Sequence, residues 1–253
     1  MHASLRHAVA GLALVLLARS GAQAASSGRM ITFSATTGSR GYLALPHGGG
    51  THPALIVIQE WWGLNDWVKE QADKLAAQGY VALAPDLYHG KSADTPEGAM
   101  ALAQAFNRDQ GVKELQAAFA YLSRRRDVRA KDVGVIGWCF GGGLSIALAE
   151  QQPGLKACVV YYGQVPSDSA TVARIHAPVL GNFGGADRNI TPAIVHAFEQ
   201  AMHDAGRAAD VKIYPGMPHA FAGSRAVAPA EVAAALDAWA RTLAFLRAHL
   251  NGR

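Results

Sequence analysis

A glycine-rich turn at residues 137–142, Gly-Trp-Cys-Phe-Gly-Gly, constrains the fold of this chain more than any other stretch. It follows the apolar run 133–136, typical of a buried strand, and precedes residues 143–149, which fit a helix. A strand, a sharp G-x-C-x-G turn and a helix form the pattern of a nucleophile elbow. Such a turn exposes its central side chain at a helix N-terminus, where an anion is stabilised. The turn therefore predicts that Cys139 is a nucleophile, with a buried structural cysteine as the alternative.

The rest of the chain alternates between strand and helix patterns. Turn residues between the runs 30–35 and 41–45 predict an antiparallel hairpin. Further strands, most of them apolar, are predicted at 54–58, 80–84, 133–136, 155–161, 178–183 and 211–214. Helices are predicted at 65–78, from 111, at 143–149, at 192–205 and up to 250. The last helix carries a predicted core face of Val232, Leu236, Trp239, Leu243, Leu246 and Leu250.

This order of elements predicts an α/β fold in a single domain. We expect an eight-stranded, mostly parallel sheet with helices on both faces. Half of the residues are hydrophobic and 17% are charged, which is ample for a large core. In such sheets ligands bind at the carboxyl ends of the strands, so loops that follow strands are where functional residues are expected.

The N-terminus has the layout of a secretory signal peptide. A weakly basic start with Arg6 is followed by the apolar run 8–18 and by the small-x-small sequence Ala22-Gln23-Ala24. The apolar run is too short to span a bilayer stably, and an uncleaved anchor is the alternative. We therefore expect residues 1–24 to be removed and residues 25–253 to form an exported domain, periplasmic or secreted, without a stable membrane span.

The charge balance gives little support to nucleic-acid binding. The chain has 23 Lys and Arg against 19 Asp and Glu, and Arg6 and Arg19 lie in the predicted signal. The basic triplet 124–126 ends a predicted helix, where cations complement the helix dipole. We expect a monomer whose partner is a small molecule.

The chain has two cysteines, Cys139 and Cys158. Exported proteins commonly pair their cysteines, but a disulfide would remove the nucleophile from the elbow. Cys158 lies within the predicted strand 155–161, where a small apolar residue fits. We therefore predict two free thiols, with Cys158 buried.

A nucleophilic thiol needs a base and a group that orients the base. Asp187 follows the predicted strand 178–183, and His219 follows the predicted strand 211–214. Taken alone, Asp187 reads as a turn or cap residue and His219 as a loop histidine. Both lie in loops at the carboxyl edge of the sheet, in the chain order nucleophile, acid, histidine. This order predicts a Cys-His-Asp triad.

Two backbone donors are needed for the oxyanion of acyl transfer. Phe140 N–H directly follows the nucleophile, and Trp61 N–H lies in the loop after the strand 54–58. Glu60 in the same loop would raise the pKa of the thiol or hold its proton, because it places a carboxylate in the site. An ordinary strand-end glutamate is the alternative reading of Glu60.

These motifs together resemble the dienelactone hydrolase family over residues 30–250. They are G-x-C-x-G-G at the elbow, Q-E-x-x-G at 59–63, P-D-L-Y at 85–88, the glycine-rich loop with Asp187, and Y-x-G-x-x-H-x-F at 214–221. The resemblance implies an α/β-hydrolase fold and a triad of Cys139, His219 and Asp187.

The resemblance also implies an oxyanion hole at Trp61 and Phe140. Glu60 would accept the thiol proton in the resting enzyme, so that substrate binding triggers formation of the thiolate. The implied activity is hydrolysis of activated esters or enol lactones through a thioester, without a cofactor or metal.

The chain departs from the degradative members of that family in its cations. Those members carry one arginine shortly after P-D-L-Y and another shortly after H-x-F, and the pair grips the substrate carboxylate. Here Lys91 and Arg225 are the substrate-binding candidates, from shifted positions. Two alternatives stay open: a short-chain esterase or thioesterase, and a thiol-sensing or binding protein without hydrolase turnover on the same scaffold.

Overall fold

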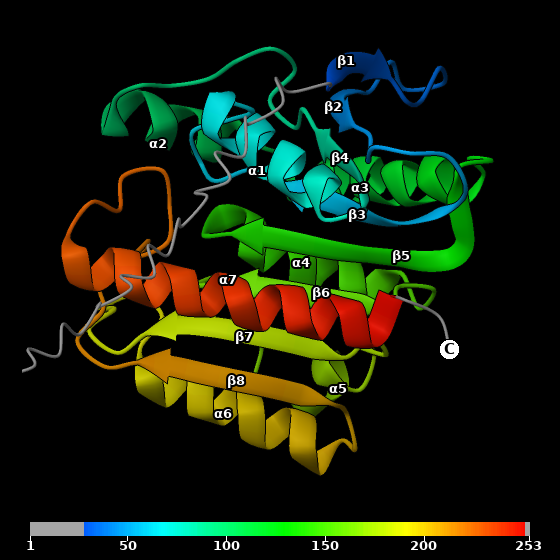
Figure 1. Cartoon of the computed structure of the whole chain (residues 1–253). Coiled ribbons are helices and arrows are strands. Elements are labelled where there is room, and N and C mark those ends of the chain that lie inside the picture. Colours follow the sequence, from blue (N-terminus) through cyan, green and yellow to red (C-terminus); the bar gives the residue numbers. More distant parts are fainter. Residues whose placement is uncertain (1–27, 251–253) are drawn as a thin grey trace, which may run out of the picture.

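The computed structural model describes residues 28–250, except for the side chains of residues 130 and 131. Its centre is one sheet of eight strands in the order β1-β2-β4-β3-β5-β6-β7-β8 (Figure 1). The strands are β1 (Arg29–Thr32), β2 (Arg40–Ala44), β3 (His52–Ile58), β4 (Val81–Pro85), β5 (Val128–Trp138), β6 (Ala157–Tyr161), β7 (Val179–Gly184) and β8 (Ala209–Tyr214). Strands β1 and β2 form the predicted antiparallel hairpin, β2 pairs antiparallel with β4, and the other pairings are parallel. The prediction of an eight-stranded, mostly parallel sheet is confirmed.

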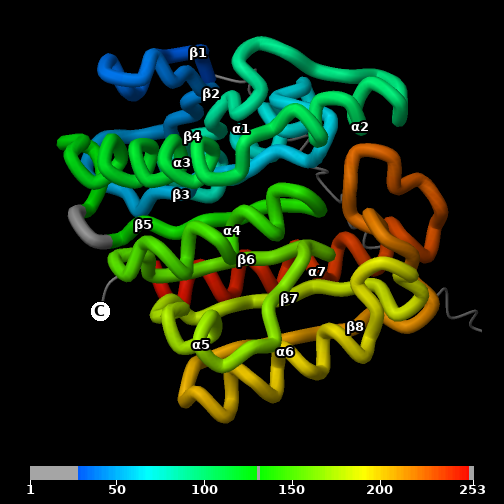
Figure 2. Tube along the Cα trace, turned by 180° about the vertical axis from the view of Figure 1, so that it is seen from behind, coloured from blue at the N-terminus to red at the C-terminus, as the bar shows by residue number. Residues whose placement is uncertain are grey.

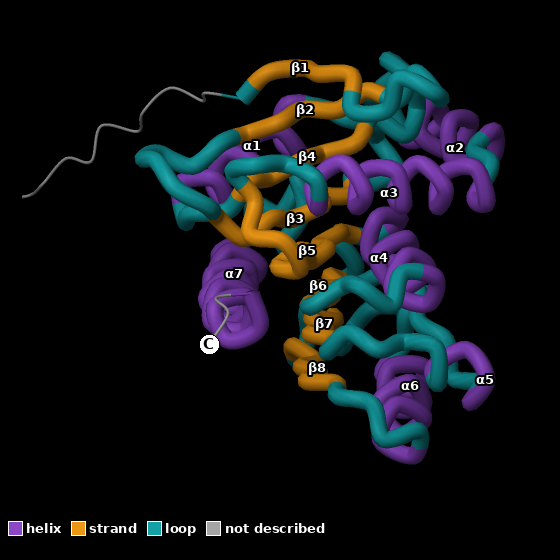
Figure 3. The backbone as a smooth tube through the Cα atoms, turned by 90° about the vertical axis from the view of Figure 1, so that its right-hand side faces the viewer, coloured by secondary structure: helices purple, strands orange, loops and turns teal. Residues whose placement is uncertain are grey.

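Helices cover both faces of the sheet, as expected for strands that are apolar on both sides. The helices are α1 (Asp66–Ala77), α2 (Pro96–Ala105), α3 (Arg108–Ser123), α4 (Phe140–Gln151), α5 (Ser169–Val172), α6 (Pro192–Asp204) and α7 (Pro229–Leu250). Seen along the sheet, α1 and α7 lie on one face and α3, α4 and α6 on the other (Figure 3). The view from behind shows α3, α4 and α6 side by side across the sheet (Figure 2). Each face buries its own apolar cluster.

Local signals fix the ends of the predicted helices. Asn65 caps α1 by accepting from Val68 N–H at 3.1 Å, and Gly79 adopts φ +96° just after the helix. Helix α2 is not among the predicted helices, because Ala99 is its one buried residue and apolar periodicity therefore does not reveal it. Its start nevertheless carries comparable local signals. Thr95 caps it and Pro96 stands at its first position. The short α5 is likewise absent from the predictions.

The predicted core face of α7 is wrong in the first half of the helix. Val232 and Leu236 are 43% and 67% exposed, whereas the buried residues include Ala238 and Thr242. Figure 1 shows the first turns of α7 beside the loop that follows β8, past the ends of the strands. A helix buries its apolar stripe only where the sheet lies beneath it. The second half of α7 packs on the sheet, and Leu246 is buried there as predicted.

The loops that carry the predicted site residues meet at one edge of the sheet. The carboxyl ends of β3, β5, β7 and β8 point to the same side, where α2 and the loop 215–228 also lie (Figure 1). Within residues 28–250, no helix combines the length and apolarity that crossing a membrane requires. The predicted signal peptide, residues 1–24, falls outside the described residues.

Candidate active site

Cys139 stands at a sharp turn between β5 and α4. Its backbone adopts φ 53° and ψ −115°, a conformation that costs a residue with a Cβ about 1–3 kcal/mol. Neighbouring strands hold it there, because Cys139 N–H donates to Tyr161 C=O at 2.9 Å. The thiol is partly exposed and unpaired, and Cys158 is a free, buried cysteine on β6. The prediction of two free thiols is confirmed.

The glycines of the turn are required by close backbone approach. A Cβ on Gly137 would lie 2.2 Å from Gly141 C=O, and a Cβ on Gly141 would lie 2.4 Å from Gln59 C=O. Both distances are below any normal contact, so a larger residue would push α4 away from β3 and β5. The G-x-C-x-G pattern is therefore the condition for bringing Cys139 next to the loop that follows β3.

His219 lies between the thiol and a carboxylate. Its Nε2 is 3.1 Å from Cys139 Sγ, and its Nδ1 is 2.6 Å from Asp187 Oδ2. The side chain of Asp187 is fully buried, and its other oxygen accepts from the N–H groups of Asn189 and Ile190 at 2.8 and 3.0 Å. These donors hold the carboxylate in place as a fixed partner for the imidazole. The structure thus brings together the three residues that the sequence predicts as a triad, 80 and 32 residues apart.

Backbone hydrogen bonds join the two loops that carry Asp187 and His219. Gly185 N–H donates to Tyr214 C=O at 2.8 Å, and Ala186 N–H donates to Met217 C=O at 2.9 Å. Because the loops follow the paired strands β7 and β8, their separation is fixed by the sheet. A rigid scaffold of this kind fixes the Asp187 carboxylate and the His219 imidazole relative to each other.

The thiol opens into a cavity of about 440 Å³. Its lining is mostly apolar, with Trp61 and Trp62 from the loop after β3 and Met100 from α2. His219, Ser224 and Arg225 line it on the side of the loop 215–228. A cavity of this size, with a thiol and an imidazole in its wall, suits a small organic substrate.

Glu60 is a buried carboxylate in the same wall. It is 3% exposed, and its Oε2 accepts from Ser224 Oγ at 3.2 Å and from Ser224 N–H at 3.5 Å. Burial raises the pKa of Glu60, and these hydrogen bonds, His219 and Arg225 oppose that rise. In the structure the side chain of His219 lies at hydrogen-bond distance from the thiol, whereas the carboxylate of Glu60 is held by Ser224. The role of Glu60 as acceptor of the thiol proton stays a prediction.

The surroundings of Cys139 favour the neutral thiol. Burial, followed by the negative charge of Glu60, raises its pKa to about 12, although a hydrogen bond from Phe140 N–H lowers it. Asp187 adds a smaller upward effect. A thiol that stays protonated at neutral pH is a weak nucleophile and a poor target for oxidants.

The two predicted oxyanion donors belong to two different segments, the start of α4 and the loop after β3. Phe140 is the first residue of α4, so its N–H has no partner within the helix. Trp61 follows Glu60 in the loop after β3 and lines the cavity together with Cys139. The glycine contacts between α4 and β3 described above bring these two segments together.

The two substrate-binding candidates are placed differently. Arg225 lines the cavity, with its guanidinium 4.0 Å from the centroid of the Trp62 ring and its Nη2 donating to Asp94 C=O at 2.9 Å. Lys91 lines a separate hollow of about 230 Å³ that also contains Glu114. The structure therefore brings Arg225, and not Lys91, to the cavity of Cys139.

Sequence reasoning missed several residues of this cavity, among them Met100 and Ser224. The cap at Thr95 and Pro96 could have revealed α2 and hence Met100. Ser224 contacts Glu60 across 164 residues of sequence, and no local pattern signals such a contact.

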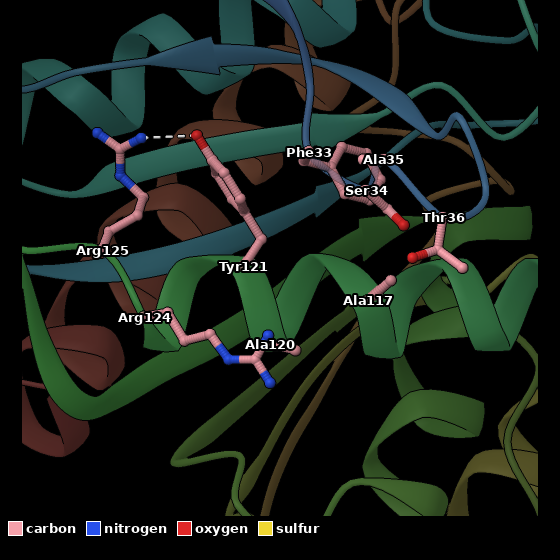
Figure 4. Close-up of a pocket in the computed structure, with 9 residues that line it drawn as sticks. All are labelled: Phe33, Ser34, Ala35, Thr36, Ala117, Ala120, Tyr121, Arg124 and Arg125. Atoms are coloured by element: carbon pink, nitrogen blue, oxygen red, sulfur yellow. Dashed lines mark hydrogen bonds between the residues drawn. The ribbon is translucent and has the colours of Figure 1, made fainter.

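A further hollow of about 350 Å³ lies between the segment 33–36 and α3 (Figure 4). Its two arginines differ. Arg125 donates to Tyr121 Oη at 2.8 Å and pairs with Asp127, whereas Arg124 is turned away from the Tyr121 hydroxyl (Figure 4). The residues that line the hollow include no cysteine, histidine or carboxylate, so its hydroxyl groups have no general base beside them. Among residues 28–250, no group of three or more His, Cys, Asp or Glu side chains is arranged to hold a metal ion.

Comparison with known proteins agrees with this architecture. The model of the dienelactone hydrolase family matches residues 39–250. The chain belongs to the dienelactone hydrolase family. "Protein usf" of Aquifex pyrophilus is 35% identical over 219 residues, which cover 84% of this chain and 94% of the relative. "Putative carboxymethylenebutenolidase" of Aquifex aeolicus is 31% identical with the same coverage of 84% and 94%.

A solved structure described as a "putative dienelactone hydrolase" from Klebsiella pneumoniae superposes with a TM-score of 0.74 and 28% identity. The match covers 82% of this chain and 92% of that protein. Family membership and fold together confirm that this chain is an α/β-hydrolase enzyme of the ester and lactone hydrolase class.

Proposed function

We propose that this dienelactone hydrolase family member cleaves activated esters or enol lactones with Cys139 as nucleophile, His219 as base and Asp187 as the group that orients the base. The observation that carries the proposal is the position of His219, 3.1 Å from the thiol and 2.6 Å from the buried carboxylate. A thiol is a weak acid, so its use as a nucleophile requires a base in contact with it and a third group that orients the base.

The first half of the reaction forms a thioester. His219 Nε2 takes the thiol proton as the sulfur of Cys139 attacks the carbonyl carbon, and the carbonyl oxygen becomes an oxyanion held by the N–H groups of Trp61 and Phe140. The carbon–oxygen bond then breaks, and the leaving oxygen takes the proton from His219. Asp187 stabilises the imidazolium while it carries that proton.

The second half regenerates the thiol. His219 removes a proton from water, whose oxygen attacks the thioester carbonyl. The carbon–sulfur bond breaks, Cys139 recovers its proton from His219, and the carboxylic acid product leaves. The reaction consumes one water and needs no redox partner.

A direct test is to trap the covalent intermediate. The purified protein is mixed with nitrophenyl acetate, quenched in acid within milliseconds and digested, and we expect an acetyl group on the peptide that contains Cys139. The control is protein first alkylated with iodoacetamide, which should show neither the acetyl group nor ester turnover. Ester hydrolysis without acylation of Cys139 would contradict the thioester mechanism, and acylation of Cys139 without continued turnover would favour a thiol sensor.

A second prediction concerns Glu60, whose charge raises the pKa of the thiol. Replacing Glu60 with glutamine removes that charge, so the pKa of Cys139 should fall and more thiolate should exist near neutral pH. We expect faster alkylation by iodoacetamide at pH 7, by about tenfold for a change of one pKa unit, together with slower turnover of esters. Glu114→Gln is a matched control, because Glu114 is a buried carboxylate on α3 that does not line this cavity. An alkylation rate equal to that of the unmodified protein would exclude this role of Glu60.

The compartment and assembly of the protein are part of the proposal. The segment 1–24 supports export as a periplasmic or secreted enzyme, and we propose a monomer that acts on a small molecule. In an oxidising compartment a thiol that is neutral at rest is protected, because oxidants react with the thiolate.

A further inference from the structure

Tyr162 is a buried residue beside His219, and the proposed mechanism gives it no role. It directly follows β6 and is fully buried, and its hydroxyl has no hydrogen-bond partner among the described residues. A buried hydroxyl without a partner is unfavourable, and native structures retain few of them. The Tyr162 hydroxyl would therefore be stabilised by a hydrogen-bond acceptor, and the described residues do not place one within hydrogen-bond geometry.

The backbone of Tyr162 is also strained. Its φ is 39°, in the left-handed region that bulky side chains rarely adopt. A hydrogen bond from Tyr162 N–H to Asn182 C=O at 2.8 Å holds this conformation. Strain that the surroundings maintain is concentrated at functional sites, and here it turns the ring toward the His219 imidazole, with ring centroids 5.2 Å apart.

An acceptor close to the Tyr162 hydroxyl is the Glu60 carboxylate, whose charge raises the pKa of the phenol. Glu60 Oε1 and Tyr162 Oη lie 2.7 and 3.2 Å from the point where a Cβ on Gly223 would stand. A glycine at 223 leaves the space between the two oxygens free. Ser224 already occupies Oε2 of the same carboxylate, so Oε1 is the oxygen that faces the phenol.

We propose that Tyr162 is a positioning residue that donates its hydroxyl to Glu60 Oε1 when Glu60 is ionised, and so acts with Ser224 to hold the carboxylate beside Cys139. The inference rests on the proposed function for its catalytic meaning. Burial raises the pKa of Tyr162 well above 10, so the phenol is a hydrogen-bond donor throughout the working pH range. The other ionisable groups around Glu60 are Cys139, His219 and Arg225.

The test measures the titration of Glu60 directly. In the Cys139→Ala variant, the infrared carbonyl band of the protonated Glu60 carboxyl is followed against pH and assigned by its loss in Glu60→Gln. Adding Tyr162→Phe removes one donor to the anion, so the protonated form should persist to higher pH. We expect the midpoint to rise by about one pH unit. Phenylalanine keeps the ring and its packing against His219.

Tyr161→Phe is the matched control. Tyr161 is equally buried, but its hydroxyl lies 2.7 Å from Thr242 Oγ1 under α7, so the midpoint should not move. Ser224→Ala removes a donor that the structure shows and sets the scale of the shift. In protein with Cys139 intact, Tyr162→Phe should also move the acid limb of kcat/KM upward.

An unchanged midpoint in Tyr162→Phe, or an equal shift in Tyr161→Phe, would overturn the inference. The infrared measurement requires no turnover. A shifted midpoint in a protein that proves to have no thioester chemistry would therefore support the Tyr162 contact while refuting the proposed function.

Discussion

Replacing Cys139 with alanine is expected to lower kcat for an aryl ester by roughly four to six orders of magnitude, as loss of a triad nucleophile does. Alanine keeps the Cβ and therefore tolerates the φ of 53° as cysteine does. The side chain is partly exposed at the cavity, so its loss removes little packing. The measurement combines steady-state kinetics with circular dichroism and a thermal melt, which should show a folded protein.

Cys158→Ala is the matched control for this variant. Cys158 is fully buried on β6, in the cluster that α3, α4 and α6 cover, so its truncation should lower the unfolding free energy by about 1–3 kcal/mol and leave kcat intact. If Cys139→Ala keeps near-full activity, or if Cys158→Ala loses it, Cys139 is not the nucleophile.

The second large effect concerns the leaving group, because the proposed nucleophile is sulfur. The tetrahedral intermediate expels either the substrate oxygen or the thiolate, and the group with the lower pKa leaves more readily. The pKa of the Cys139 thiol is raised to about 12, a phenol has a pKa of about 10, and an alcohol resembles water at about 15.7. With a phenolate or enolate leaving group the intermediate therefore goes on to the thioester. With an alkoxide it expels the thiolate instead and returns to the reactants. We expect kcat/KM for phenyl acetate to exceed that for ethyl acetate by about a hundredfold or more.

Intrinsic reactivity must be separated from this effect of the enzyme. The same two esters are hydrolysed by hydroxide without protein, and the enzymatic ratio should be larger than the uncatalysed ratio. Amides, whose leaving groups are more basic still, should scarcely react. Equal enzymatic and uncatalysed ratios would argue against a thiolate that competes as leaving group.

Much of the site was predictable because its parts are short and local. The turn at 137–142 shows the pattern of a nucleophile elbow in six consecutive residues. Its glycines are recognisable because a residue with a Cβ at 137 or 141 would prevent β3, β5 and α4 from approaching so closely. Asp187 and His219 directly follow strands, and parallel strands bring their carboxyl ends to one edge. Strand order and strand-end position therefore determined where these side chains would meet.

Other features required the folded chain. Whether the apolar residues of α7 are buried depends on where the sheet ends, and for this reason Leu236 is 67% exposed despite its helical spacing. Helix α2 and Met100 cover the cavity although the helix buries a single residue, so hydrophobic periodicity gave no signal.

The sequence by itself determined the fold class, the family and the chain positions of Cys139, His219 and Asp187, which we propose as nucleophile, base and acid. Glycine requirements, apolar runs and strand-end positions are local properties that one stretch of residues carries. The tertiary structure alone decided that Ser224 holds Glu60 and that Lys91 lies outside the cavity. It also decided that the Tyr162 hydroxyl is buried with no hydrogen-bond partner within residues 28–250. Those contacts join loops whose paths depend on packing across the whole sheet, and so no local pattern encodes them.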